Sequence, residues 1–213
     1  DGTSVNPRTD ANVQASKTVQ AAFRSTGGAD LDWYAEQLRR TGREVLLTRE
    51  PGGTELAEAL RELLLGQAMD ALTELLLMFA ARRDHLERRI RPALASGTWV
   101  VCDRFTDSTL AYQGAGRQGP EERIRALAGW VHPDLWPDRT YLFDLPADEA
   151  LRRRAKARAA DRFEAEDLAF FERVRAGYRA QARAEPDRFL VIDASQEIDR
   201  IRSILAADCA RMR

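Results

Sequence analysis

Short apolar runs alternate with longer amphipathic segments from residue 44 to the end of the chain. This alternation is typical of α/β proteins, in which helices connect the strands of a parallel sheet. The apolar runs predict strands at 44–48, 98–103, 139–145 and 188–194. Helical periodicity predicts helices over 54–65, 70–95, 120–131, 147–157, 165–184 and 196–212. Ligands of such folds bind outside the carboxyl ends of the strands, so residues there are the first candidates for a site.

The beginning of the chain breaks this pattern. Residues 1–30 contain no apolar run of four and mix Gly, Ser, Thr, Asn and Asp, as loops and disordered segments do. A central parallel strand is buried on both faces and consists mostly of Val, Ile and Leu, so we expect none here. We predict an atypical segment over 1–30, disordered or replaced, and one domain over 31–213. An upstream reading-frame error would explain the change; agreement of every base on resequencing would refute that hypothesis.

Charge and cysteine content exclude several classes of partner. Lys and Arg number 33 and Asp and Glu 34, so no net field attracts nucleic acid or an acidic membrane surface. Cys102 and Cys209 show neither metal-ligand spacing nor a disulfide framework, which fits a reducing compartment. The longest apolar stretches are far shorter than the roughly 18 residues that span a bilayer. We therefore expect a cytoplasmic protein without nucleic-acid or membrane partners.

The motif TREPGGT (48–54) lies between a predicted strand and a predicted helix. Pro51 fixes φ, and the two glycines allow a tight or left-handed backbone. Glu50 then lies at the carboxyl end of the strand. Taken alone, Pro-Gly-Gly is typical of an ordinary turn, but the whole string is much more specific than its glycines.

A second motif, LLLMFAARRDHL (75–86), has the pattern of a helix. Phe79 and Arg82 are three residues apart, so they occupy adjoining parts of one helix face. Taken alone, an aromatic ring on an apolar stripe is typical of a core position. If it faces a ligand instead, such a ring stabilises a stacked base by about 1–3 kcal/mol, whatever the base.

Two further segments carry charges suited to phosphate chemistry. Asp103 and Arg104 follow a predicted strand directly, where a carboxylate can organise Mg²⁺ and a guanidinium can bind a phosphate through two hydrogen bonds. Taken alone, this pair also fits a surface ion pair. The segment 151–167 is rich in arginine. It fits a solvated helix face, but phosphoryl transfer also needs mobile arginines near the transferring group.

In this order, TREPGGT, LLLMFAARRDHL and DRFTDSTLAYQGAGR resemble the motifs of bacterial thymidylate kinase, and the resemblance covers about 44–213. It implies an α/β, P-loop NTPase-like fold of the nucleoside monophosphate kinase type. That fold has three layers and a parallel five-stranded sheet flanked by helices, with the first strand doubtful in this chain. The resemblance also implies a lid around 151–164, transfer of the γ-phosphoryl group of ATP to dTMP with Mg²⁺, and a homodimer.

The resemblance implies roles for individual residues. Arg104 would hold the acceptor phosphate, and Tyr112 would pack under the deoxyribose. Phe79 would stack on thymine, and Gln113 would form a hydrogen bond with it. The implied substrate-binding residues are Glu50, Pro51, Phe79, Arg82, Arg104, Ser108, Tyr112 and Gln113. The implied catalytic residues are Asp103, Arg104, Arg153, Arg154 and Arg158, with Arg162 a further lid candidate. The implied metal ligands are Asp103, through water, and Glu50.

The phosphate loop of this family cannot be read in residues 1–45. Such a loop has the pattern Gly-x-x-x-x-Gly-Lys-Ser/Thr, whose backbone N–H groups and lysine bind the phosphates. Residues 11–18 have the required spacing but lack both glycines, which leaves Lys17 and Thr18 as candidate ATP ligands. Counting back from the motif WYAEQLRRTG places 26–29 there instead. Neither alignment restores the site.

Three functions therefore remain open. The first is an active dTMP kinase, and the second is a relative that binds dTMP but is catalytically impaired. The third is another deoxynucleotide or deoxynucleoside kinase of the same fold, against which the thymine-associated string AYQG argues.

Overall fold

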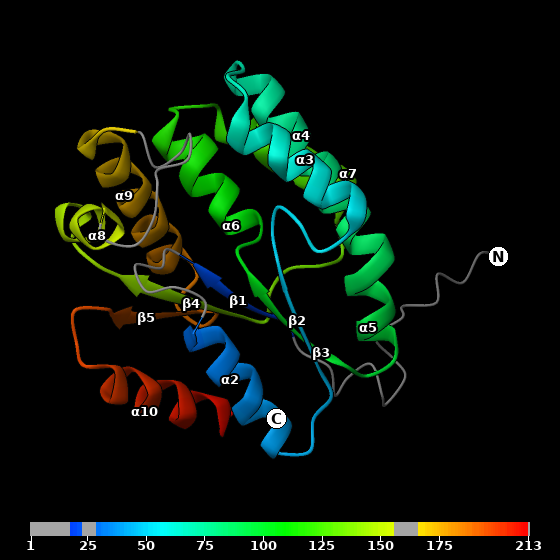
Figure 1. The fold of residues 1–213 in the computed structure, drawn as a ribbon, viewed down its shortest axis with the longest axis vertical. Helices are drawn as coiled ribbons and strands as arrows, with labels where there is room; N and C mark the ends of the chain where they lie inside the picture. The colour runs from blue at the N-terminus through cyan, green and yellow to red at the C-terminus, as the bar shows by residue number, and fades with distance from the viewer. Residues whose placement is uncertain (1–17, 23–28, 156–165, 213) are drawn as a thin grey trace.

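The computed structural model describes residues 18–22, 29–155 and 166–212. Within them, five parallel strands form one sheet in the order β2-β3-β1-β4-β5 (Figure 1). The strands are β1 (Thr18–Ala22), β2 (Val45–Arg49), β3 (Trp99–Asp103), β4 (Arg139–Asp144) and β5 (Phe189–Asp193). The last four confirm the strands predicted from the apolar runs, to within one residue at nearly every end.

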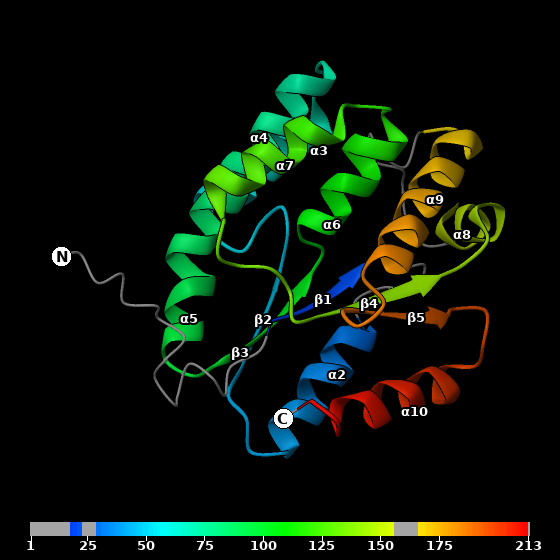
Figure 2. The same cartoon turned by 180° about the vertical axis from the view of Figure 1, so that it is seen from behind.

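Helices cover both faces of the sheet and complete the predicted three layers. One face carries α2 and α10, and the other carries α6 and α9 (Figure 1). On that second side, α4 packs against α3 and α7 (Figure 2). The helices are α2 (Ala29–Arg40), α3 (Glu55–Gly66), α4 (Ala71–His85), α5 (Arg91–Ala95), α6 (Thr106–Thr109), α7 (Glu121–Val131), α8 (Ala147–Ala155), α9 (Leu168–Ala184) and α10 (Ile198–Cys209). Two π-helical turns, η2 (Leu86–Ile90) and η3 (Leu110–Gly116), extend α4 and α6.

The expectation that residues 1–30 contribute no central strand is wrong for β1. This strand lies between β3 and β4, with Val19 paired to Val101 on one side and to Arg139 on the other. Its sequence, TVQAA, is less apolar than a central strand usually is. The side-chain pattern did not predict this strand. Backbone hydrogen bonds to β3 and β4 stabilise it, and such bonds do not depend on residue type.

Sequence periodicity also missed two helices, α2 and the helix formed by α6 and η3. The second has the sequence TDSTLAYQGAG, which is rich in residues of low helix propensity. It forms because α9 packs along it, so tertiary contacts override the local preference. Gly177 of α9 permits this close approach, since a Cβ there would lie 2.7 Å from Ala115.

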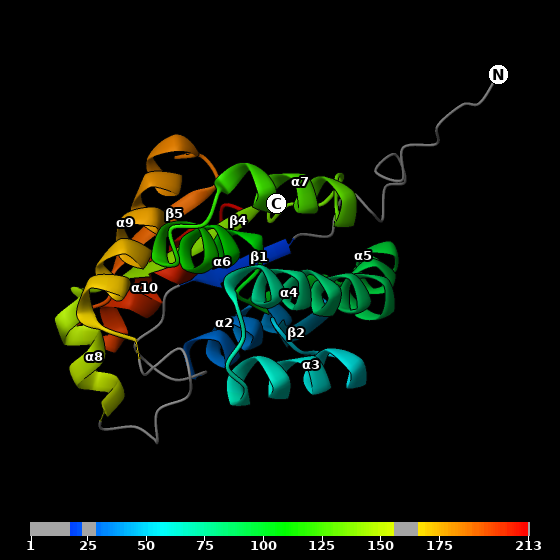
Figure 3. The ribbon, with the colours of Figure 1, turned by 90° about the horizontal axis from the view of Figure 1, so that it is seen from above.

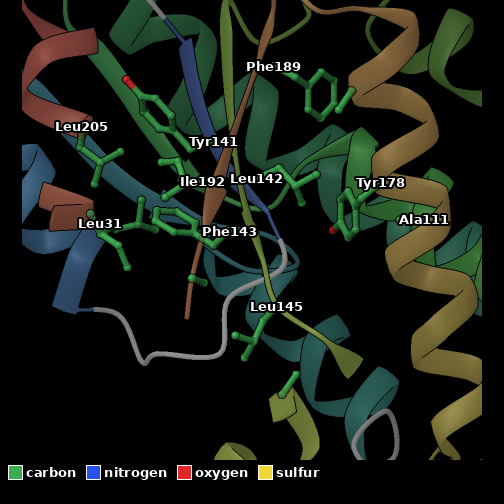
Figure 4. Packing of buried hydrophobic residues seen from close by; sticks show 14 of the residues in the cluster. Leu31, Ala111, Tyr141, Leu142, Phe143, Leu145, Tyr178, Phe189, Ile192 and Leu205 are labelled. Atoms are coloured by element: carbon green, nitrogen blue, oxygen red, sulfur yellow. The ribbon is translucent and has the colours of Figure 1, made fainter. Parts of the chain in front are cut away.

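The main core lies on both sides of β4. Tyr141 and Phe143 point toward Leu31 and Leu205 on the α2 and α10 side, and Leu142 points the other way (Figure 4). This alternation follows from the two-residue period of a strand. Among the described residues, no helix is both long enough and apolar enough to cross a membrane.

Candidate active site

The carboxyl ends of β2 and β3 bring the first and third sequence motifs together. Arg49 and Asp103 are paired in the strand register, and the amide of Glu50 donates a 2.8 Å hydrogen bond to the carbonyl of Asp103. On the other side of β3, Ala21 of β1 is also paired with Asp103. The strands β1, β2 and β3 therefore end at one edge of the sheet, where ligands of parallel α/β folds bind.

Glu50 is a buried carboxylate held by two basic side chains. Its Oε2 lies 2.7 Å from Nε of Arg82, and its Oε1 lies 3.1 Å from Nδ1 of His85. Burial by itself raises the pKa of Glu50, but the nearby Arg82 and His85 outweigh it and lower that pKa below its usual value. Both oxygens bond to protein groups, so Glu50 holds Arg82 in place. Its role as a metal ligand stays a prediction.

The loop after β2 depends on glycine at one position. Gly53 has a φ of 89°, and a Cβ there would lie 2.4 Å from Nε2 of the buried His85. That histidine also bonds to the hydroxyl of Thr48 at 2.7 Å. Pro51 lies in the same loop, where its carbonyl accepts a hydrogen bond from Arg61. Glycine at position 53 is therefore needed for close packing against His85 as well as for the turn.

Arg82 presents a buried donor for which the described part of the chain supplies no acceptor. Its Nε bonds to Glu50, and its Nη2 donates to Oγ1 of Thr109 at 3.0 Å. Its Nη1 is buried and has no hydrogen-bond partner among the described residues. The guanidinium lies between the rings of Phe79 and Phe105, 4.8 and 5.1 Å from their centroids. An unsatisfied buried N–H is costly, so this atom is a candidate ligand donor.

Phe79 lies in the core in this structure. Its side chain is 2% exposed and packs with Leu75, Leu110 and Ile124. The Arg82 guanidinium lies over its ring. This position agrees with what an aromatic ring on an apolar stripe alone predicts, and stacking of Phe79 on a base stays a prediction.

Arg104 and Tyr112 lie together beyond the end of β3. Arg104 has a φ of 69°, which is uncommon for a residue other than glycine and is found most often at functional sites. Its guanidinium lies 4.7 Å from the ring centroid of Tyr112. Tyr112 in turn makes edge-to-face contacts with Phe170 and Tyr178 of α9. The stack therefore orients the guanidinium of Arg104, and phosphate binding by Arg104 stays a prediction.

The helix α6 is anchored by polar contacts with its surroundings. Tyr178 of α9 donates a 2.7 Å hydrogen bond to Oγ of Ser108. The neighbouring Asp107 is fully buried and accepts from Arg188 through both carboxylate oxygens, at 2.7 and 2.9 Å. It also accepts from Thr140 of β4 at 2.9 Å. These bonds hold the helix that carries the predicted substrate-binding residues.

Gln113, on the same helix, bonds to an acid that sequence reasoning missed. Its Nε2 donates a 2.7 Å hydrogen bond to Oε1 of Glu74, which is 1% exposed. One sequence feature could have identified Glu74: it is the one acidic residue in the apolar stretch ALTELLLMF. It lies eight residues before Arg82, and so near the same helix face. Sequence analysis also missed His85 and Thr109. The position of His85, three residues after Arg82 and so near the same helix face, could have identified it.

Of the other residues predicted for the site, Asp103 lies at the carboxyl edge of the sheet and Thr18 does not. Asp103 lies at this edge, partly exposed, and Mg²⁺ usually binds one or two carboxylates together with substrate phosphates, so this position fits that ion. Among the residues that the structure describes, no cluster of three His, Cys, Asp or Glu could hold a metal. Thr18 begins β1 and pairs with Val100, so it lies at the opposite, amino-terminal end of the strand, away from the site. Lys17, Arg158 and Arg162 fall outside the described residues, whereas Arg153 and Arg154 lie in α8, without a description of their side chains.

A buried histidine borders this site. Nδ1 of His132 donates to the carbonyl of Leu135 at 2.9 Å, and Nε2 lies 2.7 Å from the hydroxyl of Thr106, which donates to it in the neutral tautomer. Burial, aided by the positive charge of Arg82, lowers the pKa of His132 to about 4. The folded protein therefore keeps this ring neutral well below the pH at which a free histidine is protonated.

We expect His132 to make folding pH-dependent. In the unfolded chain its pKa is near 6.5, so between about pH 6.5 and about pH 4 the unfolded state binds the proton and the folded state does not. Stability should fall by up to about 3 kcal/mol as the pH drops through that window. Urea unfolding across this range should have a shallower pH dependence in His132→Asn, which cannot titrate. An equal slope in both proteins would contradict the expectation.

The fold and the site define a class. A parallel sheet of this order, with charged side chains at its carboxyl edge and an arginine-rich segment after β4, is that of a P-loop NTPase-like nucleoside monophosphate kinase. The protein-family model described as thymidylate kinase matches residues 31–204. This chain belongs to the thymidylate kinase family.

Individual relatives agree with this assignment. Thymidylate kinase from Bordetella petrii is 53% identical over 190 residues, which cover 89% of this chain and 90% of the relative. The enzyme from Thiobacillus denitrificans is 55% identical over 188 residues, or 88% and 91% of the two chains. The crystal structure of thymidylate kinase from Ehrlichia chaffeensis superposes with a TM-score of 0.71 at 32% identity, covering 92% of this chain and 97% of that one.

Proposed function

We propose that this protein transfers the γ-phosphoryl group of ATP to dTMP and so forms dTDP. The observation that carries the proposal is the free Nη1 of Arg82, a buried donor beside Phe79 and Phe105. A carbonyl oxygen of thymine would satisfy it. Family membership supports the same substrate, and the string AYQG argues against another deoxynucleotide or deoxynucleoside kinase.

The other residues at the carboxyl edge would act on the phosphates. Arg104 would bind the dTMP phosphate, and Tyr112 would pack against the deoxyribose. Asp103 would help to hold Mg²⁺ together with the phosphates, and the ion when bound would neutralise charge on the transferring group. Arg153, Arg154 and Arg158 of the lid segment would donate to the equatorial oxygens of that group.

The ATP side of the site supports a second candidate function. The sequence has two lysines, Lys17 and Lys156, and neither belongs to the segment between β1 and α2 where this fold holds its phosphate-loop lysine. A chain without that lysine keeps the dTMP pocket but loses stabilisation of the transferring charge. The second candidate is therefore a dTMP-binding relative with impaired catalysis.

We also propose a homodimer formed through α3 and α4. Four leucines on these neighbouring helices have between 41% and 52% of their surface exposed: Leu56, Leu63, Leu72 and Leu76. Contiguous apolar patches on a protein surface mark interaction sites, and a second copy of the chain would cover these leucines. Analytical ultracentrifugation would test it, and Leu63→Glu should shift the protein toward monomer.

Calorimetry with dTMP tests the proposed function without requiring turnover. Arg82→Lys keeps the charge beside Glu50 but removes the Nη1 donor, so it should weaken dTMP binding by about 1.5–3 kcal/mol. Arg83→Lys is the matched control on the same helix: Arg83 is half-exposed and pairs with Glu87, so affinity should not change. A coupled assay for ADP formation then separates an active kinase from an impaired one. Well-folded protein that does not bind dTMP would refute the proposal.

A further inference from the structure

Glu74 is a buried acid beside the residues predicted to bind thymine. The proposed reaction gives this acid no role. It lies in the first turn of α4, beside α6 and η3 (Figure 3). Two polar contacts join these helices: Glu74 with Gln113, and Arg82 with Thr109. The first places a carboxylate against the amide that the family resemblance assigns to the base.

The carboxylate determines which end of that amide is free. A carboxylate only accepts hydrogen bonds, so only the NH₂ group of Gln113 can face Glu74. Its Nε2 does so at 2.7 Å. The carbonyl Oε1 of Gln113 then lies on the other side of the amide, away from Glu74.

Glu74 also forms an ion pair through its other carboxylate oxygen. Arg117 lies 3.4 Å from the other carboxylate oxygen of Glu74 and also bonds to Glu166. Gln113 is 5% exposed, so water competes little with these bonds. Rotating the Gln113 amide would place its carbonyl against a buried carboxylate, which is strongly unfavourable.

We propose that Glu74 is a positioning residue that sets base specificity: it orients Gln113 so that the pocket accepts an N3–H donor and excludes cytosine. This inference rests on the proposed function. The base would then meet one acceptor, Oε1 of Gln113, and one donor, the unpartnered Nη1 of Arg82. Thymine matches it with a donor at N3 and a carbonyl at position 4. Cytosine has an acceptor at N3 and an amino group at position 4. The Gln113 acceptor would therefore face an acceptor, and the Arg82 donor would face a donor.

The test compares two ligands that differ only at this edge, dTMP and 5-methyl-dCMP. The wild-type protein should bind dTMP at least about a hundredfold more tightly, because two mismatched contacts are each worth about tenfold. In Glu74→Gln the new amide can donate to the Gln113 carbonyl, so Gln113 can turn and present its NH₂ to the base. The preference should fall by about tenfold or more. A purely structural role would weaken both ligands equally and leave the ratio unchanged.

A double variant provides the rescue. In Glu74→Gln with Gln113→Glu, the amide donates to the carboxylate, whose second oxygen again accepts from N3–H, so the preference should return. If Glu74→Gln does not fold, as judged by thermal melting, Gln113→Met tests the same step, since removing the amide should lower the preference by a similar factor. An unchanged ratio in the folded variant would overturn the inference. Failure of wild-type protein to bind dTMP would instead refute the proposed function, so the two failures are distinct.

Discussion

Rebuilding the phosphate loop between β1 and α2 should raise the turnover of dTMP by at least about 10²-fold. The substitutions are Ala21→Gly, Thr26→Gly, Gly27→Lys and Gly28→Ser, which place the pattern Gly-x-x-x-x-Gly-Lys-Ser over 21–28. Ala21 pairs with Asp103 at the carboxyl edge, and α2 begins at Ala29, so the motif would lie between a strand and a helix as it requires. Each backbone or lysine donor aimed at the developing charge contributes roughly 10²–10³ in rate.

The matched control keeps the new glycines and serine but carries Gly27→Ala in place of the lysine. It should fold like the rebuilt protein and remain close to the starting turnover, because the lysine that reaches the β- and γ-phosphates is missing. Coupled measurement of ADP formation gives the turnover of all three proteins. Turnover typical of the family from the unaltered chain, with its mass confirmed, would contradict the prediction.

Arg104→Ala should weaken dTMP binding by about 2–5 kcal/mol. The left-handed backbone of Arg104 and its stack on Tyr112 hold the guanidinium beside the end of β3, where a phosphate can bind through two hydrogen bonds. Removal of one partner from such a desolvated pair is costly because the phosphate is left without its countercharge. Calorimetry with dTMP measures the loss directly.

Thymidine is the control ligand for this variant, because it lacks the phosphate. Its affinity should be nearly equal in the wild-type protein and in Arg104→Ala. Arg173→Ala is a control for the general loss of an arginine, since Arg173 donates to the carbonyl of Gly116 and is not one of the predicted substrate-binding residues. Equal losses for dTMP and thymidine would show that Arg104 supports the pocket and does not bind phosphate.

Local sequence patterns were sufficient for four strands of the sheet and for the region of the acceptor site. Strands β2 to β5 are short segments rich in apolar residues, and a strand of that kind is recognisable without knowing its neighbours. Asp103 and Arg104 directly follow such a run, so their place at the carboxyl edge followed from the strand itself. The helix of α6 and η3 could not be predicted in this way, because its serines, threonines and glycines favour other conformations until α9 packs on it.

By itself, the sequence determined the fold class and the group of residues that meet at one edge of the sheet, because both depend on hydrophobic period and on local order along the chain. Only the tertiary structure decided which buried polar side chains pair: Glu50 with Arg82 and His85, and Glu74 with Gln113. It also placed TVQAA at the centre of the sheet. These contacts join segments at least 32 residues apart, as Glu50 and Arg82 are. Buried polar groups must find partners wherever the packed helices and strands bring them, which no local pattern encodes.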